Sequence, residues 1–426
     1  MVYFMVFGFL LLCIFGVPIA FGLGISSALP LIIEQKISLI IMPQRFFAGI
    51  DSFPMLALPF FLLSAALMSG GGLVKRIISM FNSFFGHIKG SLAYTNVATS
   101  MFFAGISGSG IADTSSEGPI IIPAMVESGY DADFSVAITA SSSVMGPIIP
   151  PSIPLIIYGA VTSVSIIKLF LGGLIPGVLL GISQFILCYF HIKKRNYPTI
   201  GKISNKERLQ IFKDGIWALI MPAILVGGII FGIFTVTELA CVSVVYSLII
   251  GIYFYKSLKW SDIPKLLADV AVDTAVVMFA IGATTLFSWV LTMYRVPQIV
   301  SASITSFATN KFIFYVLVNV LFLIAGMFLD STPATLMLVP ILLPAVKALN
   351  IDLVQFGVVV VFNLMLGLIT PPVGICLMIA SQIGKVSIGK AFKAAMPFLL
   401  AGIAILLLIT YVPGVVTFLP NLVMGN

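Results

Sequence analysis

Long apolar runs separated by short polar interruptions occupy almost the whole chain. A helix needs about 20 apolar residues to cross a bilayer, and several runs reach or approach that length. The predicted crossings cover residues 1–26, 52–70, 165–190, 215–235, 238–255, 265–292 and 394–412. Residues 27–51 and 73–90 carry more charge and are typical of interfacial arm helices. The pattern therefore predicts an all-α polytopic membrane protein.

Two kinds of segment depart from simple crossings, and each kind occurs twice. Residues 91–128 and 311–347 contain two short apolar limbs around a polar tip, so we predict two re-entrant hairpins that enter the membrane without crossing it. Residues 134–160 and 353–380 are long enough to cross, but glycines and prolines interrupt them near the middle. Proline removes a helical hydrogen bond, and we therefore predict two broken helices.

The same small residues and prolines return after a shift of 221 residues, which takes Gly105 to Gly326. Other matched positions are Gly146 and Gly367, and the pairs Pro150-Pro151 and Pro371-Pro372. We infer a first repeat over residues 1–190, a cytoplasmic loop and linker helix over 191–237, and a second repeat over 238–426. The single linker helix makes the repeats inverted relative to each other. Matched helix breakers in two halves indicate the binding site of a secondary transporter.

Composition and charge support a membrane protein and give its orientation. Hydrophobic residues make up 60% of the chain, charged residues only 9%, and the mean hydropathy is +1.18. Of the 22 lysines and arginines, only six fall outside in the predicted topology: Lys36, Arg45, Lys168, Arg295, Lys311 and Lys347. This bias places the N-terminus in the cytoplasm and the C-terminus outside. The same bias explains the net charge of +7 without a nucleic-acid partner.

The sequence lacks the common signatures of catalysis. There is no GxxxxGK[ST] nucleotide-binding loop, no HExxH zinc motif and no CxxC pair among the four cysteines. The two histidines lie beside basic residues at segment ends, away from the apolar core. We therefore expect no enzyme activity, and we expect an ion gradient rather than ATP to supply the energy.

Backbone oxygens at the tips and breaks are the expected cation ligands. Unwound carbonyls suit Na⁺, and half-helix N-termini suit a carboxylate. We predict two sodium sites, one in each repeat. The candidate ligands of the first are Gly105, Ser107, Ser109, Ser143, Gly146 and Ile149. Those of the second are Gly326, Thr332, Thr335, Gly367, Thr370 and Val373. The alternative is that these small residues only kink and pack helices.

A carboxylate substrate is expected between the two tips. Candidate contacts are Ser109, Asp113 and Ser115, and Arg295 could meet the anion on entry. Asp113 has an alternative role as a cap of its own tip, and Arg295 has one as an interfacial side chain. Asp273 lies inside the 265–292 span, and we expect it to serve as a cap or an interhelix bond.

Several motifs resemble the large membrane subunit of tripartite ATP-independent periplasmic (TRAP) transporters, and the resemblance runs essentially end to end. They are Phe46–Pro54, Gly105–Glu117, Gly129-Tyr130 with Phe134, Gly146–Pro154 and Thr370–Gly374. The resemblance implies an elevator-type carrier of the bacterial inner membrane, with its C-terminus in the periplasm. It also implies a Na⁺ gradient, a separate small four-helix membrane subunit and a periplasmic substrate-binding protein.

The implied substrates are organic acids such as C4-dicarboxylates or sialic acid. A stand-alone ion-coupled carboxylate or anion carrier of the same superfamily is an alternative. An ion channel is a further alternative, although a channel should show a continuous polar pore face rather than two closed hairpins.

Overall fold

The computed structural model describes residues 5, 7–9, 11–12, 15–35, 37–195, 197, 199, 204–296, 298–299 and 310–425. All regular structure within these residues is helical. In this part of the chain, seven helices are long and apolar enough to cross a membrane, or eight if α4 (Ala57–Gly70) and α5 (Leu73–Phe85), which meet at 65°, form one bent span. The fold class of an all-α polytopic membrane protein is confirmed at this level.

The N-terminal helices do not follow the predicted boundaries. Within the described residues, α2 (Ile19–Glu34) begins directly after Pro18 and crosses the predicted boundary between residues 1–26 and 27–51. Proline has no N–H to donate inside a helix, which explains why the helix starts after it. A second short helix, α3 (Ile41–Ile50), follows and has no buried residue.

The first predicted hairpin is a pair of helices, α6 (Ser91–Ser107) and α7 (Gly110–Glu127). The chain reverses through Gly108, whose φ of 63° lies in the left-handed region that glycine adopts without strain. The first predicted broken helix is α8 (Ala132–Ser143) followed by α9 (Ile153–Thr162). Three prolines lie in the nine residues between them, and the missing N–H groups explain why the helix stops.

The second half contains the same succession of helices. Its hairpin is α15 (Lys311–Phe328) and α16 (Ser331–Ala348), and its broken helix is α17 (Leu353–Gly367) and α18 (Ile375–Gly384). A shift of 221 takes the bounds of α7, 110 and 127, to 331 and 348, which are the bounds of α16. By length and hydropathy α15 and α16 also qualify as candidate spans, so helix length alone does not separate a hairpin from two crossings.

The two halves pack into each other. Helix α18 of the second half contacts α7 and α8 of the first, and α16 of the second half contacts α9 of the first. The pairs α7–α18 and α9–α16 exchange under the 221-residue shift, so the packing is reciprocal. Each half thus covers part of the hairpin and of the broken helix of the other half.

The connection between the halves is shorter than predicted. Helix α11 (Asn205–Ile230) begins eight residues before the predicted end of the polar loop at Lys213. It starts there because Ser204 and Glu207 form a capping box, in which each side chain accepts a hydrogen bond from the other residue's backbone N–H. Lys202, in the loop that we expect to be cytoplasmic, lies outside the described residues.

Upstream of α11, the chain is attached to the first broken helix. The Tyr197 hydroxyl donates to Asp131, the N-cap residue of α8, at 2.7 Å. The ring of Tyr197 also stacks on Tyr130, with centroids 4.3 Å apart. The end of α10 (Ile166–Lys193) is thereby attached to the open end of the first hairpin.

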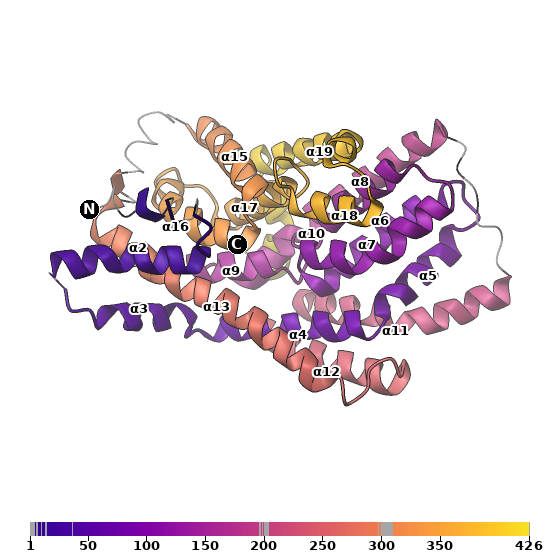
Figure 1. Ribbon diagram of the computed structural model, residues 1–426, viewed down its shortest axis with the longest axis horizontal. Helices are drawn as coiled ribbons and strands as arrows, with labels where there is room; N and C mark the ends of the chain where they lie inside the picture. Colours follow the sequence, from indigo (N-terminus) through magenta and orange to yellow (C-terminus); the bar gives the residue numbers. More distant parts are fainter. Residues whose placement is uncertain are drawn as a thin grey trace.

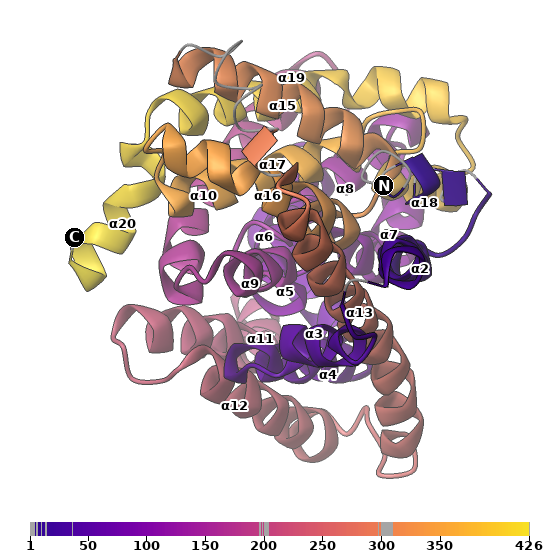
Figure 2. The same cartoon turned by 90° about the vertical axis from the view of Figure 1, so that its left-hand side faces the viewer.

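Figures 1 and 2 share a vertical axis and show three levels of helices. Helices α15, α17 and α19 (Ile388–Tyr411) lie at the top, and α3, α4 and α12 (Val236–Ile249) lie at the bottom. Helices α6, α7, α9 and α10 lie between, while the long α13 (Ile263–Met293) crosses the levels. A last helix, α20 (Gly414–Met424), follows the expected final crossing and was not predicted.

Candidate functional site

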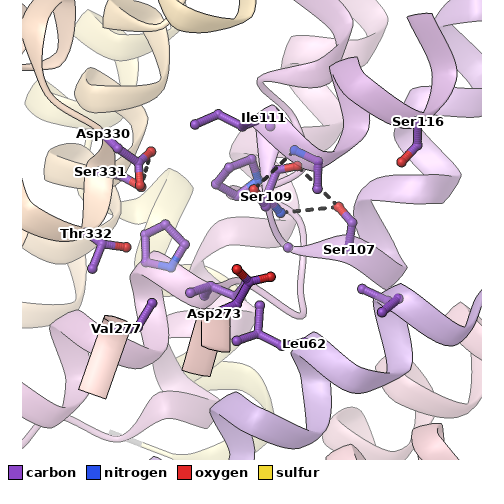
Figure 3. A pocket seen from close by; sticks show the side chains of 18 of the residues that line it. Leu62, Ser107, Ser109, Ile111, Ser116, Asp273, Val277, Asp330, Ser331 and Thr332 are labelled. Atoms are coloured by element: carbon purple, nitrogen blue, oxygen red, sulfur yellow. Dashed lines mark hydrogen bonds between the residues drawn. The ribbon is translucent and has the colours of Figure 1, made fainter. Parts of the chain in front are cut away.

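A cavity of about 530 Å³ lies where the two hairpin tips approach α4 and α13. Figure 3 shows Ser107 and Ser109 of the first tip, Asp330, Ser331 and Thr332 of the second, and Asp273 of α13 around this space. The volume lies in the range of small-molecule sites. Six hydroxyl side chains line the cavity: Ser69, Ser107, Ser109, Ser116, Ser331 and Thr332. No lysine or arginine does so in the described part of the chain.

The first tip is held by its own serines. Ser109 is the N-cap of α7, and its hydroxyl accepts a hydrogen bond from the N–H of Ala112 at 3.3 Å. The N–H of Ser109 donates in turn to the Ser107 hydroxyl at 3.2 Å, and both bonds are drawn in Figure 3. A serine at an N-cap satisfies an otherwise free helical amide, so the sequence itself fixes where α7 begins.

Behind this tip lie two buried carboxyl groups on one face of α7. Asp113 accepts a hydrogen bond from the Ser107 hydroxyl through one oxygen, and Glu117 accepts one from Ser100 at 2.7 Å. The other oxygen of each group, Oδ2 of Asp113 and Oε1 of Glu117, has no hydrogen-bond partner among the described residues. Both side chains are fully buried. Buried oxygens without partners are energetically unfavourable and are suited to a bound cation.

Both break glycines lie against their own hairpins. A Cβ on Gly146 would meet the Asp113 carboxylate, so this residue must be small for the carboxylate to lie there. A Cβ on Gly367 would meet the backbone of Gly326 in α15. Each break therefore contacts its hairpin close to the tip, most closely through the Asp113 side chain in the first half and through the Gly326 backbone in the second.

The second half supplies fewer free side-chain oxygens. The Thr335 hydroxyl is buried and has no hydrogen-bond partner within the described chain. The Thr370 hydroxyl, in the break after α17, donates to the Leu366 carbonyl of α17 at 2.7 Å. Asp330 stands at the N-cap position of α16 and lines the cavity rather than lying behind it.

The predicted sodium ligands are only partly brought together. Ser107, Ser109 and Gly146 gather around Asp113, and the Ser143 carbonyl approaches Gly110. Ile149 instead packs its side chain against Gly177 of α10, and Gly105 faces Pro222 of α11. In the second half Gly326 and Gly367 touch, and Thr332 lines the cavity, while Val373 lies in the turn before α18.

Of the four predicted substrate contacts, the structure brings only Ser109 to the cavity wall. Asp113 is fully buried behind the tip. Ser115 is exposed on another face of α7, because the 3.6-residue helical period takes it away from the face that carries Ser116 into the cavity. Arg295 lies exposed beyond the end of α13 and is not part of the cavity lining.

Sequence reasoning missed Asp273 as a cavity residue. We expected a cap or an interhelix bond, but Asp273 lines the cavity and forms neither a hydrogen bond nor an ion pair within the described chain. The signal was present, since an acidic residue inside a membrane span is a functional candidate by default. Ser69, Ser116 and Ser331 were also missed, because the sequence does not show which of the serines on a helix or tip faces a cavity.

The residues around the first tip fit a hard monovalent cation. They offer carboxylate, hydroxyl and carbonyl oxygens, and the free Asp113 oxygen is the observation on which this fit rests. In the described part of the chain, no cluster of three or more histidine, cysteine or acidic residues could hold a metal ion. The cavity itself suits an anion, because the N-termini of α7 and α16 both lie there and carry the positive ends of helix dipoles.

Paired hairpins, paired broken helices and a polar cavity between the tips define a class of membrane protein, the secondary transporters. The family is shown by comparison with known proteins. Residues 6–415 match the family model described as "Tripartite ATP-independent periplasmic transporter, DctM component". The chain therefore belongs to this family of TRAP transporter large permeases, and the relatives it matches are transporter permeases rather than enzymes.

Curated relatives cover nearly the full length of the chain. It is 37% identical to the sialic acid TRAP transporter large permease protein SiaM of Vibrio cholerae serotype O1, over 99% of this chain and 98% of that protein. It is 36% identical to the C4-dicarboxylate TRAP transporter large permease protein DctM of Pseudomonas aeruginosa, over 94% of each chain.

A solved structure shares the fold at low sequence identity. The YdaH transporter of Alcanivorax borkumensis superposes with a TM-score of 0.66 at 11% identity, over 88% of this chain and 87% of that one. At this identity the likeness concerns the fold alone.

Proposed function

We propose that this chain is the large permease of a sodium-coupled transporter that imports an organic carboxylate across the bacterial inner membrane. Its partners are a small four-helix membrane subunit and a periplasmic substrate-binding protein. The observation that carries the proposal is the meeting of both hairpin tips at one cavity, with two buried carboxyl groups behind the first tip that each keep one unpartnered oxygen. The names of the relatives, which include sialic acid and C4-dicarboxylate permeases, support a carboxylate substrate.

Two sodium sites, one behind each tip, complete the proposal. The first uses the Asp113 carboxylate with the oxygens of Ser107, Ser109 and Gly146, and the second uses Thr335 and carbonyls near Gly367. The substrate carboxylate lies between them, against the amides at the N-termini of α7 and α16. Bound cations make this cavity electropositive, so sodium and substrate bind cooperatively. Coupling of this kind is reciprocal and amounts to about 5- to 150-fold in affinity.

Transport follows an elevator movement of inverted repeats, with the N-terminus in the cytoplasm and the C-terminus in the periplasm. The equal bounds of α7 and α16 after the 221-residue shift support the duplication. The reciprocal packing of α7–α18 and α9–α16 supports a two-fold relation between the repeats. In this arrangement the first hairpin opens toward the cytoplasm and the second toward the periplasm.

Reconstituted vesicles test the proposal. The large permease, purified with its small subunit, is expected to take up a carboxylate only with its binding protein and an inward Na⁺ gradient. Uptake rises sigmoidally with Na⁺ and persists without ATP. Full-rate uptake driven by a proton gradient in Na⁺-free buffer contradicts sodium coupling, and uptake without the binding protein favours a stand-alone carrier.

A further inference from the structure

Asp273 is an acidic side chain in the cavity without a partner. It is exposed, it lines the cavity, and within the described chain it forms no hydrogen bond or ion pair. Figure 3 shows its carboxylate among the residues of the two tips. It is the eleventh residue of α13, which places it about 15 Å along the helix from Ile263, at 1.5 Å per residue.

That position is unfavourable unless something compensates for it. Asp273 lies inside the long apolar α13, a candidate membrane span, and a carboxylate within such a span is expensive and typically functional. A residue that only capped or joined helices would show a partner, and Asp273 shows none in the described chain. The group that satisfies it therefore enters the cavity from outside the protein chain.

The cavity also limits what that group is. The helix N-termini at Ser109 and Ser331 attract a carboxylate. A second carboxylate in the same molecule would face Asp273 and Asp330 with no lysine or arginine in the lining to neutralise it. Like charges at short range repel each other. Hydrogen-bond donors, in contrast, suit both the Asp273 carboxylate and the six hydroxyl side chains of the walls.

We propose that Asp273 is a specificity-determining residue that selects polyhydroxylated monocarboxylates over plain dicarboxylates. The inference rests on the proposed carboxylate function and narrows it. The substrate carboxylate binds at the helix N-termini of the tips, and hydroxyl groups farther along the molecule donate hydrogen bonds to Asp273. Asp273 thus accepts hydrogen bonds from substrate hydroxyl groups and repels a second negative charge. Both effects favour polyhydroxylated monocarboxylates over dicarboxylates.

Equilibrium binding to the detergent-purified permease with its small subunit tests this without the binding protein. The probes are sialic acid, gluconate, succinate and glutamine, each measured in Na⁺ by calorimetry. The wild type is expected to bind sialic acid or gluconate more tightly than succinate. Asp273→Asn is expected to lower the affinity for the polyhydroxy acids about 10-fold, as for the loss of a charge-assisted hydrogen bond. The same variant is expected to strengthen succinate binding.

Asp269→Asn is the matched control, because Asp269 is exposed one turn earlier on α13 and does not line the cavity. It should leave the affinities for all four probes unchanged. Sodium-dependent binding with succinate preferred by the wild type would overturn the Asp273 assignment and leave the proposed function standing. Glutamine bound more tightly than either polyhydroxy acid would overturn the choice of hydroxyl donors. Binding of no probe in Na⁺ would overturn the Asp273 assignment, while vesicle uptake with the binding protein decides the proposed function separately.

Discussion

The two halves of the molecule share a backbone plan but differ in where they hold acidic side chains. In the first half Asp113 and Glu117 are buried on α7 behind the tip. The positions 221 residues later are Ala334 and Leu338, and the second half instead carries Asp330 at the tip itself. The first break glycine therefore meets a carboxylate, whereas the second meets the backbone of Gly326.

This difference shows that the duplication preserves the backbone arrangement of the two halves but not the charges of their side chains. The helix bounds and the contact between break and hairpin are common to both halves because they depend on glycine and proline. The charge around each break differs because side chains at matched positions have changed. A cation at the first break would be held by a carboxylate, and one at the second by carbonyl and hydroxyl groups, so the two predicted sites should differ in strength.

The largest expected effect is all-or-none and tests whether the halves are inverted. Glu127 and Ala348 end α7 and α16 and are both exposed. In a background without reactive cysteines, Glu127→Cys should react with a membrane-impermeant thiol reagent only from the cytoplasm, and Ala348→Cys only from the periplasm. The measurement is labelling in intact cells against inside-out vesicles. Reaction of both positions from the same side would rule out the inversion.

Next in size is the loss of the first-half carboxylate. Asp113→Ala removes the buried charge that is expected to hold a cation, and should reduce sodium-driven uptake about 100-fold, toward the upper end of typical coupling. Ser115→Ala on the exposed face of α7 is the control and should retain wild-type uptake. Initial rates in vesicles, normalised to the amount of protein in the membrane, provide the comparison. Wild-type sodium dependence in Asp113→Ala would exclude this residue from the site.

Alanine substitutions at the two break glycines should affect different properties, the thermal stability at Gly367 and the sodium affinity at Gly146. Gly367→Ala places a Cβ against immobile backbone, and overpacking of this kind costs roughly 1–3 kcal/mol, so its thermal midpoint should fall. Gly146→Ala meets a carboxylate that can rotate, so its midpoint should stay closer to wild type while its sodium affinity falls. Thermal unfolding with and without Na⁺ measures both. Equal loss of stability in the two variants would remove the proposed difference.

Larger substitutions at the same glycines should abolish function in both halves. Gly146→Val or Gly367→Val should stop uptake while the protein still reaches the membrane. Membrane quantification by immunoblotting, together with vesicle uptake, checks this. Normal transport by either variant would show that its break does not need close contact with the hairpin.

How much of this arrangement could be predicted depended on the kind of residue. Gly105, Gly146 and the Pro-Pro pairs gave the hairpins and the breaks to within a few residues, because glycine and proline act through their own backbone. The start of α11 at Asn205 was missed because its capping box lies within a polar stretch that was assigned to the loop. The helix α20 was missed because the run after Tyr411 is short.

The site was harder to predict than the fold, because it depends on helix rotation and on packing between halves. Sequence spacing predicted that Ser115 would contact the substrate, but the rotation of α7 brings Ser116, and not Ser115, to the cavity wall. Asp113 looked like a tip residue and proved to lie behind the tip, against Gly146. Asp273 joins the cavity only because α13 crosses beside both hairpins, which no local pattern reveals.

The smallest expected effect compares two hydroxyls. Ser107 donates to the Asp113 carboxylate, while Thr370 donates to the uncharged Leu366 carbonyl of α17. Ser107→Ala should therefore raise the sodium concentration for half-maximal uptake more than Thr370→Ala, by about 10-fold, as expected for a hydrogen bond to a charged group. Neither change should alter the order of substrate preference. A larger shift for Thr370→Ala would make the second break the stronger site.

The hydrogen bond between Tyr197 and Asp131 leaves only a short connection between the start of α8 and the start of α11. From Tyr197 to the cap of α11 at Ser204 the chain has seven residue steps, and a fully extended chain of that length reaches about 25 Å at most. While Tyr197 remains hydrogen-bonded to Asp131, the start of α8 and the start of α11 cannot separate further than this. In the elevator movement proposed above, the distance that α8 could travel away from α11 would thus be limited by one tyrosine hydroxyl and the covalent length of a short connection.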